Sequence, residues 1–173
     1  IKDRTGEGVI NDEDRTVIGN SIPRFTFGLN LGFEYKGFDF SCFFQGVGKA
    51  DGYVTMEAIQ PMGINGARKE HYKESFNPQD PKPGAYFPRI LSSDYNYAYM
   101  SHWVQDASYI RLKNLQIGYS FKIKGLNQLR VYASGENLFT ATKYRTWDPE
   151  TPVGARGFYP NVAVYSMGVN LNF

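Results

Sequence analysis

The last nine residues of the chain alternate strictly between apolar side chains and small or polar ones. In Tyr165–Phe173 every odd position is apolar, every even position is Ser, Gly or Asn, and the last residue is aromatic. Because a β-strand points successive side chains to opposite faces, this segment predicts a strand with one apolar face and one wet face. A strand of about ten residues with this pattern is typical of an outer-membrane barrel, whose strands are apolar outside and polar inside.

The composition favours such a barrel over an ordinary soluble domain. The chain has 173 residues, of which 13 are Tyr and 13 are Phe, yet its mean hydropathy is −0.44. Many large rings in a polar chain suit a barrel with aromatic girdles and a wet lumen. No run approaches the roughly 18 apolar residues of a transmembrane helix, so a membrane crossing would use strands. The net charge of +2 gives no sign of a nucleic-acid partner.

Five segments have the pattern of strands. They cover residues 24–34, 38–47, 109–121, 129–138 and 162–173. The first is the clearest, because Phe and Leu occupy every odd position from Phe25 to Phe33 while Thr, Gly and Asn occupy the even ones. The alternation predicts that one face of each strand is apolar along most of its length.

Two of these strands depart from strict alternation. Phe43 lies on the polar side of the second strand, where it suits either a lumen contact or a local irregularity. In the third strand the apolar phase changes between Leu112 and Leu115. A bulge near Lys113–Asn114 reconciles the two phases, and so does a membrane crossing that begins only at Asn114.

The connections between the strands alternate in length. Residues 35–37 and 122–128 form short connections, whereas residues 48–108 and 139–161 form long ones. Outer-membrane barrels have short periplasmic turns and longer extracellular loops, so the two long connections are expected outside the cell. Five strands cannot close a barrel, which takes about eight, and open sheet edges are untenable in lipid. We therefore expect an all-β fold in which the chain forms the C-terminal five antiparallel strands of a larger transmembrane barrel.

Four groups of residues, taken together and in their order along the chain, form a recognisable pattern. They are Asp14–Asn20 with Pro23–Gly28, Asp106–Leu115 with Gly118–Tyr119, Leu129–Tyr132 with Gly135–Phe139 and Asp148–Glu150, and Tyr159–Pro160 with Gly168–Phe173. In this order they resemble the late strands of SusC-like TonB-dependent outer-membrane transporters. The resemblance spans nearly the whole chain.

This resemblance implies a barrel of about 22 strands with a plugged lumen. Residues 1–173 would be its C-terminal segment, and the plug domain and the N-terminal part that contacts the TonB complex would lie outside the chain. Members of the family lie in the lipid of the outer membrane of Gram-negative bacteria. They import glycans or peptides together with a SusD-like surface lipoprotein, and the TonB complex supplies the energy. The resemblance therefore implies a nutrient importer and not an enzyme.

Residues 3–14 have the spacing of a calcium-binding loop. Gly8 stands at the turn position. Thr5 replaces an acid or amide, Asp14 replaces the usual bidentate Glu, and no flanking helices are evident. The alternative is a polar, turn-rich loop that leads into a strand. The candidate Ca²⁺ ligands are the side chains of Asp3, Thr5, Glu7, Asn11 and Asp14 and the carbonyl of Val9.

Aromatic residues gather in the two long connections. Flat rings offer a large contact area at low entropic cost, so the candidate contacts for an oligosaccharide or peptide substrate are Tyr97, Trp103 and Trp147. Tyr and Trp also favour membrane interfaces and loop packing without any ligand. Both interpretations stay open at this point.

Catalytic chemistry has little support in the sequence. His71 and His102 stand far apart and lack the spacing of metal ligands. Cys42 falls on the expected lipid face, and Asp148-Pro149-Glu150 is typical of a turn. Two alternatives to the importer remain: an outer-membrane barrel without energy-coupled uptake, and a soluble carbohydrate-binding β-sandwich.

Overall fold

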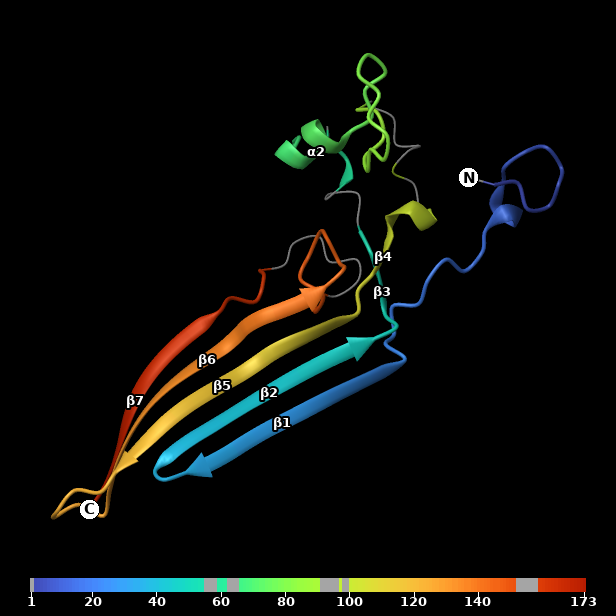
Figure 1. Cartoon of the computed structure of the whole chain (residues 1–173). Helices are drawn as coiled ribbons and strands as arrows, with labels where there is room; N and C mark the ends of the chain where they lie inside the picture. Colours follow the sequence, from blue (N-terminus) through green and yellow to red (C-terminus); the bar gives the residue numbers. More distant parts are fainter. Residues whose placement is uncertain (1, 55–58, 62–65, 91–96, 98–99, 152–158) are drawn as a thin grey trace. The chain divides into compact units, whose positions relative to one another are not determined.

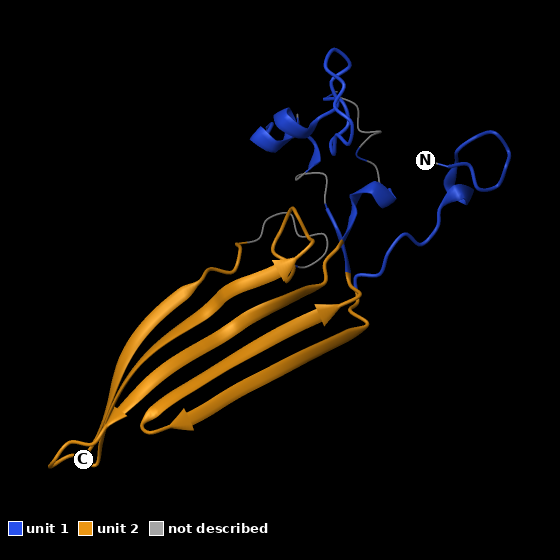
Figure 2. Cartoon of the chain, in the orientation of Figure 1, with its two compact units in different colours: residues 1–21, 51–105, 151–158 blue, residues 22–50, 106–150, 159–173 orange. Residues whose placement is uncertain are grey.

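The computed structural model describes residues 2–54, 59–61, 66–90, 97, 100–151 and 159–173. The chain divides into two compact units (Figure 2). The sheet unit comprises residues 22–50, 106–150 and 159–173, and the loop unit comprises residues 1–21, 51–105 and 151–158. Each unit therefore gathers three stretches of chain that are distant in sequence.

The sheet unit is one antiparallel sheet with the strand order β1-β2-β5-β6-β7 (Figure 1). Within this sheet each strand pairs with the strand that precedes or follows it along the chain, as in the wall of an up-and-down barrel. The strands are β1 (Phe25–Tyr35), β2 (Phe38–Gly48), β5 (Tyr109–Phe121), β6 (Gln128–Thr142) and β7 (Val164–Asn172).

A two-residue turn joins β1 to β2 and sets their register. Lys36 and Gly37 have φ values of 46° and 88°, which is the left-handed conformation that both central residues of a type I′ hairpin need. From this turn the pairing runs without a break to the far end of both strands. The turn thus fixes which side chains of β1 and β2 share a face.

The third predicted strand, β5, contains the predicted bulge. The register shifts between Phe43 and Phe44 on the β2 side of β5, and between Leu112 and Asn114 on the β6 side. Relative to β2, Lys113 is therefore an extra residue in β5, and the bulge prediction is confirmed. Relative to β6, Asn137 and Leu138 stand opposite Lys113, so the extra residue on that side belongs to β6. Because a bulge changes the phase of alternation, the apolar residues before and after Lys113 lie on the same face.

Two predicted strand limits were wrong. The strand predicted over 129–138 continues to Thr142, which pairs with Tyr109. Asn137 has a φ of 52°, and this irregularity breaks the alternation and hides the continuation from the sequence. The strand predicted to begin at residue 162 begins at Val164. The limits of the other three strands agree with the structure to within one residue.

One face of the sheet is apolar across all five strands. The register aligns Phe33 with Phe40, Phe40 with Ile117, Ile117 with Ala133, and Ala133 with Met167. Phe33, Ile117 and Met167 are nevertheless 55%, 43% and 91% exposed. A large exposed apolar face is unusual in water, and it is the arrangement expected of a barrel wall that faces lipid.

Aromatic rings of β1 cover two glycines of β2 on this apolar face. A Cβ atom at Gly46 would collide with the ring of Phe27, and one at Gly48 would collide with the ring of Phe25. The segment Gly46-Val47-Gly48 thus provides room for ring packing, one of the reasons for which a glycine occurs inside a strand.

The loop unit contains short elements and buried aromatic side chains. Strands β3 (Asp51–Tyr53) and β4 (Val104–Asp106) pair with each other. The short helices are η1 (Asp12–Asp14), α2 (Lys69–Glu74) and η3 (Ser101–Trp103). Among the residues that the structure describes, no helix is long and apolar enough to cross a membrane.

The two faces of β1 predict opposite responses to an added charge. In the full-length barrel in lipid bilayers, Leu31→Arg places a cation on the apolar face and is expected to lower the free energy of unfolding by about 2–4 kcal/mol. Asn30→Arg, one residue away on the polar face, is the matched control and should change it little. Urea unfolding measures both variants, and equal losses would contradict the assignment of the faces.

Candidate functional site

The reverse face of the sheet is polar across all five strands. One row of paired positions consists of Gly32, Ser41, Gln116, Ser134 and Ser166. Alternate residues of a strand face opposite sides, so a wall that turns its apolar face to lipid turns this polar face to the lumen. Two clusters of charged side chains lie on the polar face, one toward each end of the strands.

The first cluster is an ion pair that crosses three strands near the short turns. Arg130 on β6 donates from Nε to Asp39 Oδ2 at 2.9 Å, and a second bond joins Nη2 to Oδ1. The strand between them, β5, has Gly118 at this position, and a Cβ atom there would collide with both charged groups. The glycine therefore allows the ion pair to lie flat across β5.

An aromatic ring extends this cluster toward β7. The guanidinium of Arg130 lies 4.9 Å from the ring centroid of Tyr132, a distance at which a cation is attracted to the ring face. A Cβ atom at Gly168 on β7 would collide with the Tyr132 ring. The side chains thus form a continuous layer on the polar face, with a glycine beneath each large group.

The second cluster, called here the Arg111 cluster, consists of Arg111, Lys113, Asp148 and Glu150. Arg111 is 1% exposed, and its nitrogens donate to Asp148 Oδ2 at 2.7 Å, to Glu150 Oε2 at 2.8 Å and to Thr140 Oγ1 at 2.8 Å. Lys113 Nζ, placed by the bulge in β5, contacts Glu150 at 2.9 Å. The two cations and the two carboxylates balance each other.

Glu150 receives further hydrogen bonds in this cluster. The Tyr109 hydroxyl donates to Oε1 at 2.8 Å, and Asn161 Nδ2 donates to Oε2 at 2.6 Å. Burial acts to raise the pKa of Glu150, but the hydrogen bonds from Lys113 and Tyr109 and the charge of Arg111 outweigh it and lower the pKa below its ordinary value. Glu150 is therefore ionised at neutral pH.

The Arg111 cluster fastens the segment around residues 148–150 to the barrel wall. Breaking a buried ion pair by removing one partner leaves an uncompensated charge and is strongly destabilising. Asp148 and Glu150 belong to the long connection after β6, whereas Arg111 and Lys113 belong to β5. Asp148-Pro149-Glu150 does lie in a turn, as predicted, and its two carboxylates also anchor that turn.

The three predicted substrate contacts differ in burial. Tyr97 and Trp103 are both 0% exposed, and their rings stack with centroids 6.2 Å apart. Tyr86, Phe87 and His102 surround the Trp103 ring. Tyr97 and Trp103 therefore form part of the core of the loop unit. Trp147, in the sheet unit, is half-buried. A role of Tyr97, Trp103 or Trp147 in substrate binding stays a prediction.

The predicted calcium loop brings its first, third and twelfth positions together. The hydroxyl of Thr5 lies 3.3 Å from Asp3 Oδ1 and 3.4 Å from Asp14 Oδ1. Backbone amides also donate to both carboxylates: Gly6 and Gly8 to Asp3, and Arg4, Asn11 and Thr5 to Asp14. These hydrogen bonds lower the pKa of both aspartates.

The other predicted ligands of this loop lie less close together. Asn11 Nδ2 donates to Glu7 Oε2 at 3.5 Å, and the Val9 side chain is exposed. Across the described residues, no group of three or more His, Cys, Asp or Glu side chains is placed to hold a metal ion. The loop is thus closed by its own backbone donors, and Ca²⁺ binding stays a prediction.

Sequence reasoning missed the Arg111 cluster. Arg111 is separated by 37 and 39 residues from its two acidic partners, so no local pattern connects them. The one signal in the sequence was Arg111 itself, a cation on the polar side of a strand that contains a bulge. Bulges often redirect side chains beside functional sites.

Replacing Arg111 should loosen the connection that it anchors. For Arg111→Met in the full-length protein, the loss of one partner of a buried pair is expected to cost about 3–5 kcal/mol and to speed amide hydrogen exchange in residues 144–150. Arg15→Met is the control, because its bond to Asp12 joins side chains that are 81% and 85% exposed, and such pairs contribute little. Unchanged exchange in Arg111→Met would contradict the anchoring role.

Calcium binding is testable on the same full-length protein. Calorimetric titration with Ca²⁺ should show binding in the micromolar-to-millimolar range that such loops cover, and Asp14→Asn should abolish it. Asp12→Asn, which alters an acid outside the predicted ligand set, is the matched control. No heat of binding at millimolar calcium would end the prediction.

Comparison with known proteins finds similarity to TonB-dependent receptors. No family model matches the chain. The TonB-dependent receptor P3 of Formosa agariphila is 35% identical over 99% of this chain and 18% of its own length. The TonB-dependent receptor SusC of Bacteroides thetaiotaomicron is 27% identical over 99% of this chain and 17% of its own length.

A solved structure supports the same conclusion. The structure of the RagAB peptide transporter matches 91% of this chain and 18% of that chain, with a TM-score of 0.73 and 25% identity. The chain thus spans less than a fifth of the length of the relatives it matches. The sequence resemblance and the all-β barrel fold class are confirmed. On sequence and structure together, the chain resembles part of the β-barrel of SusC-like TonB-dependent receptors.

Proposed function

We propose that the protein to which this chain belongs is a TonB-dependent importer in the outer membrane of a Gram-negative bacterium. The observation that carries the proposal is a single five-stranded sheet with one apolar and one polar face, in a chain similar to named TonB-dependent receptors. The apolar face contacts lipid and the polar face lines the lumen. The chain itself forms part of the barrel wall. The movement of cargo depends on parts of the protein outside the chain.

The proposal assigns a direction to every strand. The short connections, at residues 36–37 and 122–127, lie at one end of the sheet unit, and the long connections follow β2 and β6. Short turns belong on the periplasmic side and long loops outside the cell. Residues 1–173 are then the C-terminal segment of a barrel of about 22 strands, and the plug domain and the TonB-contacting part belong to the rest of the protein.

The proposed cargo is a peptide or an oligosaccharide, delivered by a SusD-like surface lipoprotein. RagAB, which is described as a peptide importer, favours peptides, and SusC keeps the oligosaccharide open. Trp147 is the ring of the predicted set that remains partly exposed, so it is the proposed contact for cargo. The names of the relatives are those of receptors and transporters, and no enzymatic activity is proposed.

The soluble β-sandwich is not favoured by the structure. A sandwich buries the apolar face of one sheet against another, whereas the apolar face here is exposed along β1 and β7. The other alternative, an outer-membrane barrel without energy-coupled uptake, would have the same wall. It differs from the importer only in that its uptake needs no energy from the TonB complex.

Removal of TonB should separate these two barrels. Cells that produce the full-length protein and its lipoprotein partner are expected to take up labelled peptides or oligosaccharides, and deletion of tonB should abolish this uptake while the protein stays in the outer-membrane fraction. A transport-neutral control is Arg15→Met, on an exposed side chain. Undiminished uptake without TonB would overturn the proposal in favour of the uncoupled barrel.

A further inference from the structure

Three lysines lie in the two short connections of the sheet unit, just beyond the ends of two strands. Lys36 follows Tyr35, the last residue of β1, and Lys122 follows Phe121, the last residue of β5. Lys124 lies two residues further along the second connection. All three side chains are exposed, and together they are called here the lysine rim.

The two connections that carry the lysine rim are neighbours. Ser120 N donates to Gly37 O at 2.7 Å, and the register pairs Phe38 with Tyr119. Strands β2 and β5 are adjacent in the sheet, and both connections lie at the same end of it (Figure 1). The three cations therefore belong to one end of the wall.

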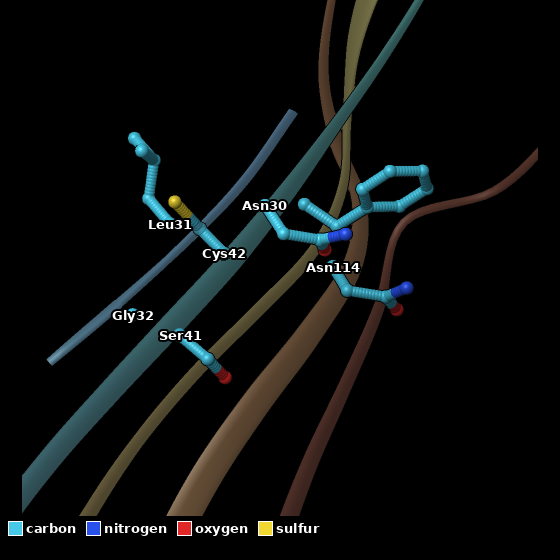
Figure 3. A pocket seen from close by; sticks show the side chains of 7 residues that line it. Asn30, Leu31, Gly32, Ser41, Cys42 and Asn114 are labelled. Carbon is cyan, nitrogen blue, oxygen red and sulfur yellow. The ribbon is translucent and has the colours of Figure 1, made fainter. Parts of the chain in front are cut away.

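Aromatic rings border the lysine rim on the apolar face. Figure 3 shows the two faces midway along the strands, where Leu31 projects to one side and Asn30 to the other. Because alternate residues of a strand share a face, Tyr35 lies on the same side as Leu31. The register continues this row from Tyr35 to Phe38 and Tyr119. Rings at the ends of an apolar band form the aromatic girdle of an outer-membrane barrel, so this row lies at the boundary between hydrocarbon and headgroups.

The ammonium group of Lys36 lies beside a lipid-facing ring. Its Nζ is 5.1 Å from the centroid of the Tyr35 ring, within the range at which a ring attracts a cation, and Tyr35 is 65% exposed. Strand β1 has 11 residues, about as many as a tilted strand needs to cross the hydrocarbon core. Lys36 directly follows this strand and therefore lies at the depth of the lipid headgroups.

The lysine rim has no acidic residue in its own connections. Residues 35–37 and 122–127 contain three lysines and no aspartate or glutamate. The nearest acids along the chain, Glu34 and Asp39, are paired in register with each other and lie on the polar face, where Asp39 accepts from Arg130. Among the described residues, no carboxylate forms an ion pair with a lysine of the rim. The rim therefore brings a positive charge to the headgroup layer.

We propose that the lysine rim binds the headgroup of an anionic phospholipid in the periplasmic leaflet, while the acyl chains of that lipid lie against the rings of the apolar face. The rim continues the lipid-facing surface into the headgroup layer, so its ligand is a lipid that already contacts the wall. This inference goes beyond the proposed function and rests on it for the orientation alone, with the short connections on the periplasmic side.

The charge of the rim distinguishes between phospholipids. Lysines beside a bilayer attract anionic lipids, and this attraction falls off within a Debye length. A zwitterionic headgroup carries its own ammonium group, which repels the lysines while its phosphate attracts them. A headgroup with a net negative charge accepts hydrogen bonds from the lysine ammonium groups without that repulsion. The rim should therefore bind phosphatidylglycerol in preference to phosphatidylethanolamine.

Photocrosslinking to lipid tests the proposal. The full-length protein with Tyr35→benzoyl-phenylalanine is placed in bilayers that contain equal amounts of phosphatidylglycerol and phosphatidylethanolamine with identical acyl chains. On irradiation, mass spectrometry should find the phosphatidylglycerol adduct in excess by about fivefold or more, since one lysine beside an anionic surface accounts for about that factor. Phe121→benzoyl-phenylalanine, at the ring before Lys122, should repeat the result if the Tyr35 variant fails to insert.

Two triple variants with the same loss of charge show whether the rim causes this excess. Both carry the probe at position 35. Removal of the rim charges should make the yields of the two lipid adducts equal, whereas removal of three exposed cations at the other end of the strands should leave the excess unchanged. The rim variant is Lys36→Gln, Lys122→Gln and Lys124→Gln, and the matched control is Arg24→Gln, Lys49→Gln and Lys143→Gln.

Three results would refute lipid binding by the lysine rim. They are equal yields of the two lipid adducts before any lysine is replaced, the same fall in both triple variants, and adducts to protein in place of lipid. TonB-dependent uptake is measured separately on the protein without the probe. Uptake without a lipid preference refutes this inference alone, whereas a lipid preference without TonB-dependent uptake refutes the importer and leaves the lipid site standing.

Discussion

Backbone hydrogen bonding in lipid is the constraint on which the rest of the structure depends. The hydrocarbon core offers no water to an unpaired N–H or C=O group, so every strand there needs a partner on both sides. In the sheet unit β2, β5 and β6 have two neighbours each, while β1 and β7 have one. The two remaining edges require strands from elsewhere, and this requirement ties the five strands to a larger closed barrel.

On both faces of this wall, glycines make room for large side chains on neighbouring strands. On the apolar face Gly46 accommodates the Phe27 ring, and on the polar face Gly118 accommodates the Asp39–Arg130 pair. In each case a Cβ atom on the glycine would collide with the large group. Side chains can thus lie flat against the sheet, which keeps the wall thin and its surface continuous from strand to strand.

The sequence predicts the sheet well because one face contacts lipid and the other contacts the water-filled lumen. Each strand therefore alternates apolar and polar residues. Alternation from Phe25 to Phe33 and along Tyr165–Phe173 is unbroken, and the bulge at Lys113 is visible as a change of phase. The end of β6 was missed because Asn137, with its positive φ, interrupts the pattern. A period of two predicts strands only where the ladder is regular.

The candidate site was harder to predict because it depends on contacts between distant residues. Arg111 meets its acidic partners across the chain, and Trp103 is buried by rings that no periodic pattern places beside it. Aromatic composition alone does not distinguish a buried ring from one that contacts a ligand. The burial of Trp103 could therefore not be predicted from the sequence, whereas the strands could.

Spin labels placed one at a time along β7 (Val164–Asn172) would test the two-faced wall most directly. In the full-length protein in bilayers, collision with lipid-soluble oxygen and with a water-soluble nickel chelate should alternate with a period of two, and odd positions should favour oxygen. Nickel access at every position, or shielding of the odd positions from both reagents, would contradict a wall between lipid and lumen.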